Sequence, residues 1–241
     1  MTGLLNRDPV NSFIFSLQSV TIFYMASQKR KHSIFLHDDR IRRQYPLVAG
    51  IDEAGRGPLA GPVVAAAVML SPGVIIDGLR DSKQVPEKER RRLFWDIISS
   101  SQSIGLGMLD ADTIDRINVL RSTKEAMGIA VQDLFTSPDI ILIDAVTLPN
   151  VKIEQKSIIR GESVSASIAA ASIIAKTVRD DIMLAYHKEY PQYNFKEHKG
   201  YSTKEHVERI RKYGPCPIHR KSFRKVMELE LPLTSKAIRR K

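Results

Sequence analysis

Two apolar segments lie close together in the chain, joined by a short loop rich in glycine and proline. Residues 47–51 read Leu-Val-Ala-Gly-Ile, and residues 62–70 contain the run Val-Val-Ala-Ala-Ala-Val-Met. Both segments are typical of buried strands. The connection is too short for a crossover helix, so the two strands are predicted to pair antiparallel. Every other predicted element has to be arranged around this pair.

The rest of the chain predicts a mixed sheet with helices. A short, fully apolar run ends at Asp144, as expected for a central parallel strand at 140–143. Further strands are predicted at 103–109 and 152–159, helices at 86–99, 110–116, 119–135, 163–186, 203–213 and 222–229, and a loop at 191–202. In the first helix, Pro86 suits the first turn and Ile98 belongs to the apolar side. The predicted fold is α/β, with a mixed sheet of about five strands flanked by helices and a small helical C-terminal extension.

The charge of the chain is unevenly distributed. The formal net charge is +10 over 241 residues, and 43% of the residues are hydrophobic, enough for a substantial core. From His187 to the end there are 15 Lys/Arg against 6 Asp/Glu, whereas residues 46–186 carry 15 against 18. A cationic region attracts polyanions, of which nucleic acid is the commonest, although many soluble proteins are basic without a specific partner.

The N-terminal residues and the single cysteine bear on the compartment. Residues 1–24 make a poor signal peptide, and no stretch is apolar enough for a membrane helix. Residues 1–24 are interpreted as an extension that the fold does not need, or as the result of a start site assigned too early, with Met25 as the true start. Cys216 stands between two prolines, without a partner for a disulfide or a zinc site. A reducing cytoplasm and no membrane association are expected.

Four carboxylates follow predicted strands or precede a predicted helix. Asp52 and Glu53 end the first apolar segment, Asp144 ends the parallel strand, and Glu162 stands before the long helix. Acids that follow apolar strands can converge at one sheet edge, and converging carboxylates suit Mg²⁺ or Mn²⁺. Alternatively, Asp144 caps a loop and Glu162 is an acid favoured by the helix dipole.

Further residues have chemistry suited to a polyanion. Gly55-Arg56-Gly57 would let backbone amides approach a sugar or phosphate closely, although a lone Gly-x-Gly is more often only a tight turn. The segment His198-Lys199-Gly200-Tyr201 combines two side chains able to contact phosphate with an aromatic ring able to stack; alternatively the histidine is solvated and the tyrosine packs in the core. Lys83, in Asp81-Ser82-Lys83, is a phosphate contact or a surface residue after a helix cap. The basic run of Lys88, Arg90, Arg91 and Arg92 is interpreted as a solvated helix face.

These motifs together resemble the ribonuclease HII family. The resemblance extends from about residue 47 to residue 223. It rests on these segments, in family order: Asp52-Glu53-Ala54-Gly55-Arg56-Gly57-Pro58-Leu59-Ala60-Gly61, Asp81-Ser82-Lys83, Ile143-Asp144, Ser167-Ile168-Ala169-Ala170-Ala171-Ser172-Ile173-Ile174-Ala175-Lys176, Arg179-Asp180 and His198-Lys199-Gly200-Tyr201. The first segment and the alanine-rich segment are each highly specific.

The resemblance implies an enzyme and a set of site residues. The enzyme is a metal-dependent endonuclease that cleaves RNA in RNA/DNA hybrids and ribonucleotides embedded in duplex DNA, leaving 3′-hydroxyl and 5′-phosphate ends. Removal of such ribonucleotides and of RNA primers serves DNA replication and repair. By resemblance, Asp52, Glu53, Asp144 and Glu162 bind two Mn²⁺ or Mg²⁺ ions, Gly55, Arg56 and Gly57 read the 2′-hydroxyl, Tyr201 senses the ribo-to-deoxyribo junction, and Lys83 contacts phosphate. Where the family usually has Asp, this chain has Glu162, one methylene longer.

The resemblance also implies a domain organisation. Residues 1–45 are expected to be a partly dispensable extension, 46–190 a ribonuclease H-like catalytic domain, and 191–241 a basic helical region with the substrate-contacting loop. A monomer is expected. Three rival functions remain open: a hybrid-binding protein without catalysis, another nuclease of the ribonuclease H-like superfamily, and a glycosidase. Adjacent acids and a basic end disfavour the glycosidase.

Overall fold

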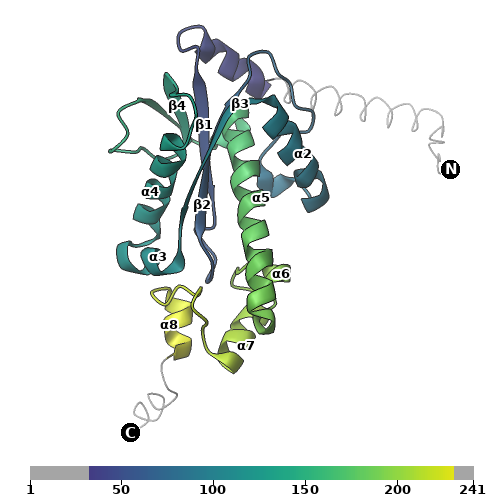
Figure 1. The fold of residues 1–241 in the computed structure, drawn as a ribbon, viewed down its shortest axis with the longest axis vertical. Coiled ribbons are helices and arrows are strands. Elements are labelled where there is room, and N and C mark those ends of the chain that lie inside the picture. Colours follow the sequence, from purple (N-terminus) through teal and green to yellow (C-terminus); the bar gives the residue numbers. More distant parts are fainter. Residues whose placement is uncertain (1–32, 231–241) are drawn as a thin grey trace, which may run out of the picture.

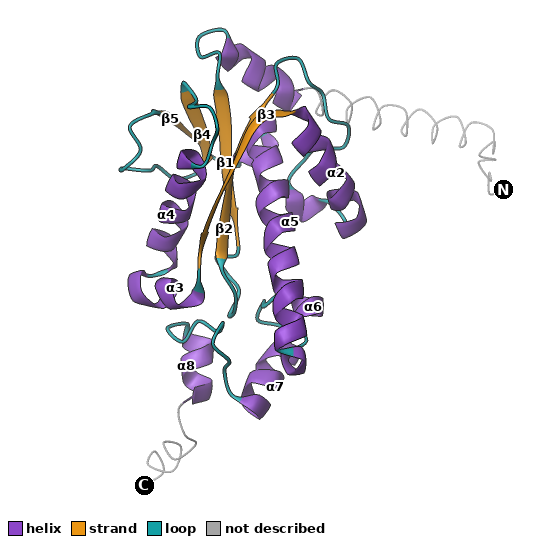
Figure 2. Cartoon of the chain, in the orientation of Figure 1, coloured by secondary structure: helices purple, strands orange, loops and turns teal. Residues whose placement is uncertain are grey.

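One five-stranded mixed sheet forms the centre of the molecule. The computed structural model describes residues 33–230, with the strand order β3-β2-β1-β4-β5. The strands are β1 (Val48–Ala54), β2 (Val63–Leu70), β3 (Ser101–Leu109), β4 (Ile140–Asp144) and β5 (Glu154–Ile158). β1 pairs antiparallel with β2 and parallel with β4 (Figure 2). The predicted α/β fold, its antiparallel pair and its parallel strand before Asp144 are confirmed.

Helices cover both faces of this sheet. The long α5 (Ala166–Glu189) lies with α2 (Glu87–Ser100) on one side, and α3 (Ala111–Ile117) with α4 (Val119–Gln132) on the other (Figure 1). Beyond one end of the sheet lie α6 (Phe195–His198), α7 (Lys204–Tyr213) and α8 (Arg224–Glu230). Short 3₁₀ turns occur at Ser82–Gln84 (η1), Gly161–Ser163 (η2) and Pro191–Tyr193 (η3). Residues 33–42 are also helical.

Small residues allow α5 to pack directly on the sheet. All of β2 is buried, and the alanines of α5 form one apolar cluster with it. Gly50 of β1 marks the closest approach, because a Cβ atom there would lie 2.1 Å from the carbonyl carbon of Ser167. Any side chain at this position would push β1 and α5 apart.

Four details of the predicted helices are wrong. The predicted loop at 191–202 contains η3 and α6, because burial of Phe195 (0% exposed) holds the chain in a helical turn that local propensity does not indicate. Pro86 precedes the first turn of α2 as its N-cap, and Ile98 is 40% exposed. The long helix begins later than predicted, at Ala166, because the Ser165 side chain caps it by accepting a hydrogen bond from the Ile168 amide.

The segment before β1 contributes to the core. Ile34 and Phe35 are buried in the cluster that includes α5. The carboxylate of Asp38 is completely buried and accepts a hydrogen bond from the Ser167 amide at 2.8 Å. The expectations for residues 1–24 and for the Met25 start lie outside the described residues. Among residues 33–230, every helix is too short or too polar to cross a lipid bilayer.

Candidate active site

Neighbouring strands bring the first three predicted acids together. Asp52 and Glu53 lie near the end of β1, and Asp144 is the last residue of β4. These two strands run parallel, and their register pairs Ile51 with Ile143, one residue before Asp52 and Asp144. The acids therefore lie at the carboxyl ends of two adjacent parallel strands, where binding crevices form in sheets of this kind.

The two adjacent acids point to opposite faces of the sheet. Side chains alternate along a strand, and Ala54 belongs to the cluster on the α5 side, so Asp52 also faces α5. Glu53 faces the other side, where its Oε1 atom lies 3.2 Å from Nη1 of Arg56. The sequence pair thus supplies one carboxylate to each side of the sheet edge.

Burial and mutual repulsion make the charged forms of Asp52 and Glu53 costly. Burial raises the pKa of Asp52 well above its usual range, and the charges of Glu53 and Glu162 raise it further. Burial also raises the pKa of Glu53, against the opposing effect of Arg56, and the charge of Asp144 adds to the increase. A cation bound among these groups would remove the repulsion and favour the ionised carboxylates.

Glu162 completes the group from the turn before α5. Its side chain carries a buried oxygen, Oε2, that has no hydrogen-bond partner within the described residues. The other oxygen, Oε1, lies 3.6 Å from Nζ of Lys83. An oxygen buried without a partner is unfavourable unless something absent from the protein binds it. The longer side chain at this position is thus directed inward, beside the other acids.

The backbone around Asp144 and Glu162 is held in an unusual conformation. Ala145 and Arg160 both adopt left-handed backbone geometry, with φ of 53° and 56°. The Gly161 amide donates a 2.8 Å hydrogen bond to Oδ1 of Asp144, which ties the end of β4 to η2. Such strain persists where surrounding contacts enforce it, and it is typical of functional sites.

The donor set fits a divalent cation by its chemistry. All four groups are hard carboxylate oxygens, the ligands preferred by Mg²⁺ and Mn²⁺, and the unpartnered Oε2 of Glu162 is available. Within residues 33–230, however, no three His, Cys, Asp or Glu side chains are close enough to form a ready-made ion cage. The fit therefore rests on the type and convergence of the oxygens.

The Gly55–Gly57 loop lies against two buried arginines. Gly55 has φ of 102°, and a Cβ atom there would lie 2.3 Å from Nε of Arg179, so both conformation and space require glycine. Gly57 faces open space. Arg220 donates from Nη2 to the Gly55 carbonyl at 2.6 Å and from Nη1 to the Arg56 carbonyl at 3.0 Å. The loop is thus held from its inner side.

The roles of Arg179 and Arg220 were not predicted from the sequence. Arg179 is completely buried and donates to the carbonyls of Pro62, Ala60 and Lys199 at 3.0–3.1 Å. The segment Arg179-Asp180, which the resemblance includes, was the available signal for Arg179. Arg220 lies 165 positions after Gly55, whose carbonyl it contacts. No neighbouring residue in the sequence indicates this role.

Tyr201 is joined to the glycine loop through Arg179. The ring is 40% exposed, and Cζ of Arg179 lies 5.7 Å and Nζ of Lys176 5.5 Å from its centre. The neighbouring Gly200 accepts a 2.8 Å hydrogen bond at its carbonyl from the Leu59 amide. The structure therefore brings together the two segments that the sequence suggested for substrate contact.

The other predicted phosphate contacts differ in exposure. The side chain of Lys83 is 80% exposed, and Oδ1 of Asp81 accepts from its amide, which confirms the helix-cap alternative for Asp81. His198 is neither solvated nor available to phosphate, because it is 7% exposed and its ring nitrogens bond the Tyr193 carbonyl and the Gly200 amide. Packing of the following helices, not local sequence, buries this ring.

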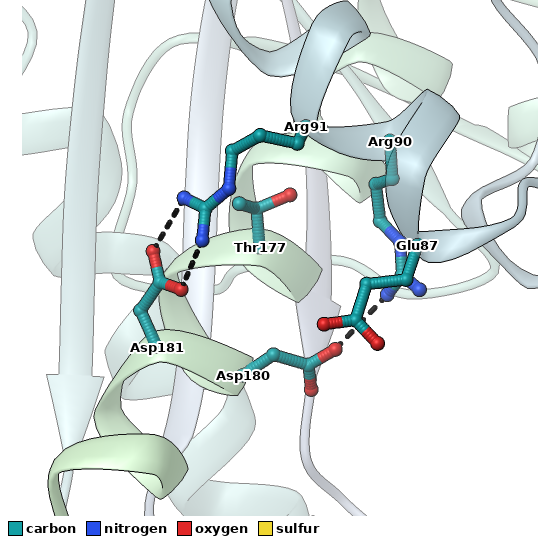
Figure 3. A pocket seen from close by; sticks show the side chains of 6 residues that line it. All are labelled: Glu87, Arg90, Arg91, Thr177, Asp180 and Asp181. Atoms are coloured by element: carbon teal, nitrogen blue, oxygen red, sulfur yellow. Dashed lines mark hydrogen bonds and ion pairs between the residues drawn. The ribbon is translucent and has the colours of Figure 1, made fainter.

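The basic residues of α2 are largely paired with acids. Nη1 of Arg90 lies 3.0 Å from Oδ2 of Asp180, and Arg91 makes a bidentate ion pair with Asp181 at 2.6 and 2.8 Å (Figure 3). The pocket between them is also lined by Thr177. These pairs connect α2 to α5. The interpretation as a solvated helix face is confirmed for Arg91 and Arg92, whose side chains are 50% exposed, and is wrong for Arg90, whose side chain is 12% exposed.

Comparison with known proteins identifies the family. The family model for Ribonuclease HII matches residues 49–226. Ribonuclease HII of Acetivibrio thermocellus is 49% identical over 90% of this chain and 86% of its own length. The enzyme of Caldanaerobacter subterraneus subsp. tengcongensis is 51% identical over 73% of each chain.

Solved structures also match the fold of this chain. Ribonuclease H2 from Pyrococcus horikoshii has a TM-score of 0.64 and 26% identity, covering 76% of this chain and 97% of that one. A Bst-RNase HIII structure in complex with Mn²⁺, 22% identical, matches the fold with a TM-score of 0.61 over 80% of this chain and 71% of that one. Two adjacent acids on a buried strand, a third on its parallel neighbour and a matching family model over most of the chain lead to one conclusion: the chain belongs to the ribonuclease HII family, enzymes that cleave the RNA strand of RNA/DNA hybrids.

Proposed function

We propose that Asp52, Glu53, Asp144 and Glu162 bind two divalent ions, Mg²⁺ or Mn²⁺, at the edge of the sheet. The observation that carries this proposal is the buried, unpartnered oxygen of Glu162 beside Asp52, whose pKa burial and neighbouring acids raise. The ribonuclease H family depends on divalent metals. Such ions supply Lewis acidity, lowering the pKa of an attacking water and stabilising charge on the departing 3′ oxygen.

The residues around the acids would hold and inspect the substrate. The carbonyls of Gly55 and Arg56 bond to Arg220, so the amides of the same peptide units point the other way, toward the open side of the loop. Those amides would read the 2′-hydroxyl, the one group at the sugar that distinguishes RNA from DNA. Tyr201 would stack at the junction with deoxyribonucleotides, and the exposed Lys83 would contact phosphate.

We further propose that the substrates include duplex DNA with embedded ribonucleotides, cut on the 5′ side of the ribonucleotide. The test is incubation of a duplex containing one ribonucleotide with Mg²⁺, with Mn²⁺ and with chelator, followed by mapping of the ends. We expect metal-dependent cleavage leaving 3′-hydroxyl and 5′-phosphate. Binding without cleavage would instead indicate a hybrid-binding protein, and cleavage of an all-DNA junction would indicate a different nuclease of this fold.

Glu162→Gln tests the fourth metal ligand. The substitution keeps the shape of the side chain but removes the charge that a cation requires. We expect the metal concentration for half-maximal rate to rise about tenfold or more, the effect usual for altered metal-site groups. Isothermal titration of the metal into the free protein should give the same shift without any turnover. Glu154→Gln, at an exposed position of β5, is the matched control. An unchanged metal titration would favour a helix-start role for Glu162.

The remaining expectations concern the cellular compartment, the oligomeric state and the domain boundaries of the protein. We infer that the protein works in the cytoplasm as a monomer, supported by its membership of a family acting on nucleic acid and by the buried, unpaired thiol of Cys216. The division at residues 45/46 and 190/191 stays a prediction. Residues 33–42 pack on α5, which favours placing them with the catalytic domain when the boundary is tested by truncation.

A further inference from the structure

Two histidines form a buried hydrogen-bonded chain behind Tyr201. Nδ1 of His206 lies 2.9 Å from the Tyr201 carbonyl oxygen, and Nε2 of His206 lies 3.1 Å from Nε2 of His219. At the far end, Nδ1 of His219 lies 2.9 Å from the Cys216 amide nitrogen. His206 is 0% and His219 1% exposed. None of these groups has a part in the proposed chemistry.

The partners of this chain determine where each proton lies. A carbonyl oxygen only accepts, so Nδ1 of His206 carries a proton and donates to Tyr201. The Cys216 amide only donates, so Nδ1 of His219 is bare and accepts. His219 therefore carries its proton on Nε2 and donates it to the bare Nε2 of His206. The Cys216 thiol, whose Sγ lies 3.1 Å from Nδ1 of His219, can donate to the same bare nitrogen, and the Cys216 carbonyl, 3.3 Å from Nδ1, accepts from the His219 amide at 2.9 Å. In this arrangement both rings are neutral.

The environment agrees with two neutral rings. Burial lowers the pKa of His206 to about 3, and nearby His198 and His219 add to the effect. Burial likewise lowers the pKa of His219 to about 4. A proton added to either ring would set two N–H groups against each other at 3.1 Å. The two hydrogen-bonded histidines therefore keep this one protonation state at neutral pH.

The same segment is held from its other side by a third histidine. The Gly200 amide donates to Nδ1 of His198, and the ring of His198 stacks on that of His206 with centres 4.3 Å apart. The amide of Tyr201 donates to the His198 carbonyl at 2.8 Å. The backbone that carries the Tyr201 ring is therefore tethered at its amide and at its carbonyl.

We propose that His206, oriented by His219, is a positioning residue that sets the Tyr201 ring for recognition of the ribo-to-deoxyribo junction. The inference rests on the proposed role of Tyr201. His206 does not touch substrate; it acts through its Nδ1–H on the Tyr201 carbonyl, which also accepts a 2.8 Å hydrogen bond from the Thr203 amide. Loss of that one hydrogen bond should weaken recognition of a single ribonucleotide more than cleavage of a continuous RNA strand, which offers many cutting positions.

Two amide substitutions separate the roles of the two ring nitrogens of His206. Asn places an amide nitrogen near the position of Nδ1, so His206→Asn keeps the donor to Tyr201 and loses the contact with His219. Gln places its amide near Nε2, so His206→Gln keeps the contact with His219 and loses the tether. The measured quantity is the ratio of kcat/KM for an embedded ribonucleotide to kcat/KM for an RNA/DNA hybrid, with thermal unfolding recorded for each variant.

We expect His206→Gln to lower this ratio about tenfold, the size expected for one orienting hydrogen bond, and His206→Asn to keep it within about twofold. Equal ratios for the two variants would overturn the proposal, since a purely structural role would affect both substrates alike. If His206→Gln does not fold, the corresponding substitutions of His219 test the proposal. His219→Asn loses the donor to His206 and should lower the ratio, whereas His219→Gln keeps that donor and should not.

Tyr201→Ala separates this inference from the function on which it rests. By itself it should lower the ratio, and His206→Gln added to it should produce no further change. An unchanged ratio in Tyr201→Ala would refute the sensing role of Tyr201. A lowered ratio in Tyr201→Ala together with an unchanged one in His206→Gln would refute only the positioning role.

Discussion

Asp52→Asn is expected to abolish metal-dependent cleavage, by about a thousandfold or more, while leaving the fold and hybrid binding intact. One buried ligand contributes to both metal binding and charge balance, so its loss removes most of the transition-state stabilisation. The amide has nearly the shape of the carboxylate, and Asp52 is 8% exposed in a well-packed position. Cleavage rates and filter binding of the hybrid, measured on the same preparation, test the loss of cleavage and the retention of binding.

The same substitution should raise thermal stability in the absence of metal. Burial and the charges of Glu53 and Glu162 raise the pKa of Asp52, so the folded chain binds this proton more tightly than the unfolded chain does. The contribution of Asp52 to stability therefore falls as pH increases past its unfolded pKa of about 4. Asp52→Asn should unfold at a higher temperature than the wild type at pH 7, and the difference should shrink below pH 4.

A surface acid provides the comparison. Asp112 is exposed in the first turn of α3, and Asp112→Asn should change neither cleavage nor the pH dependence of unfolding. Full activity in Asp52→Asn would remove Asp52 from the site. A decrease in its unfolding temperature at pH 7 would show that the carboxylate stabilises the metal-free fold, contrary to the repulsion argued above.

Arg220→Met is expected to have the largest effect on stability among changes near the loop. The guanidinium donates to the carbonyls of Gly55, Arg56 and Gly61, with distances between 2.6 and 3.0 Å. Methionine fills similar volume but leaves these acceptors without donors, at about 1–3 kcal/mol for each one that stays buried. We expect a loss of about 3 kcal/mol in the free energy of unfolding, or about 6–12 °C in the unfolding temperature.

The loss should also be visible in substrate discrimination. With its inner carbonyls unpaired, the loop at Gly55 is free to adopt other conformations, so its amides no longer face the substrate in one orientation. Burial and, to a smaller extent, the charge of Arg179 lower the pKa of Arg220 to about 9, so the group stays charged at pH 7. Arg220→Lys keeps that charge without the planar fork, and we expect an intermediate loss.

Arg211→Met on the exposed side of α7 is the matched control and should unfold like the wild type. Denaturant unfolding followed by circular dichroism, and cleavage of the embedded-ribonucleotide duplex relative to an all-DNA duplex, measure the two effects. Wild-type stability in Arg220→Met would contradict the view that this side chain holds the loop.

The strands and three of the acids were predictable because their signals are local. The run ending at Asp144 is apolar without interruption, and a buried parallel strand is the element that such a run favours. The short loop after Asp52 left antiparallel pairing as the option for β1 and β2. The opposite directions of Asp52 and Glu53 also follow from strand periodicity, although that consequence becomes clear only once the faces of the sheet are known.

The surroundings of the site were not predictable, because they depend on contacts between distant segments. Local sequence indicated a loop where Phe195 forms part of α6, since the energy that holds that turn comes from its burial among other segments. For the same reason, both alternatives for His198, a phosphate contact and a solvated side chain, were wrong. Arg179 was marked only as part of the segment Arg179-Asp180, and Arg220 was not singled out, whereas packing directs both at backbone carbonyls of a loop far away in the chain.

The sequence by itself determined the fold class, the family and the identity of the candidate site residues, since these depend on hydrophobic runs, short connections and motifs that lie within a few residues of one another. Only the tertiary structure decided how those residues are held: the unpartnered oxygen of Glu162, the arginines behind Gly55 and the histidine chain behind Tyr201. Burial and hydrogen-bond pairing are properties of the packed chain, and they set orientation and protonation after the backbone has brought distant segments together.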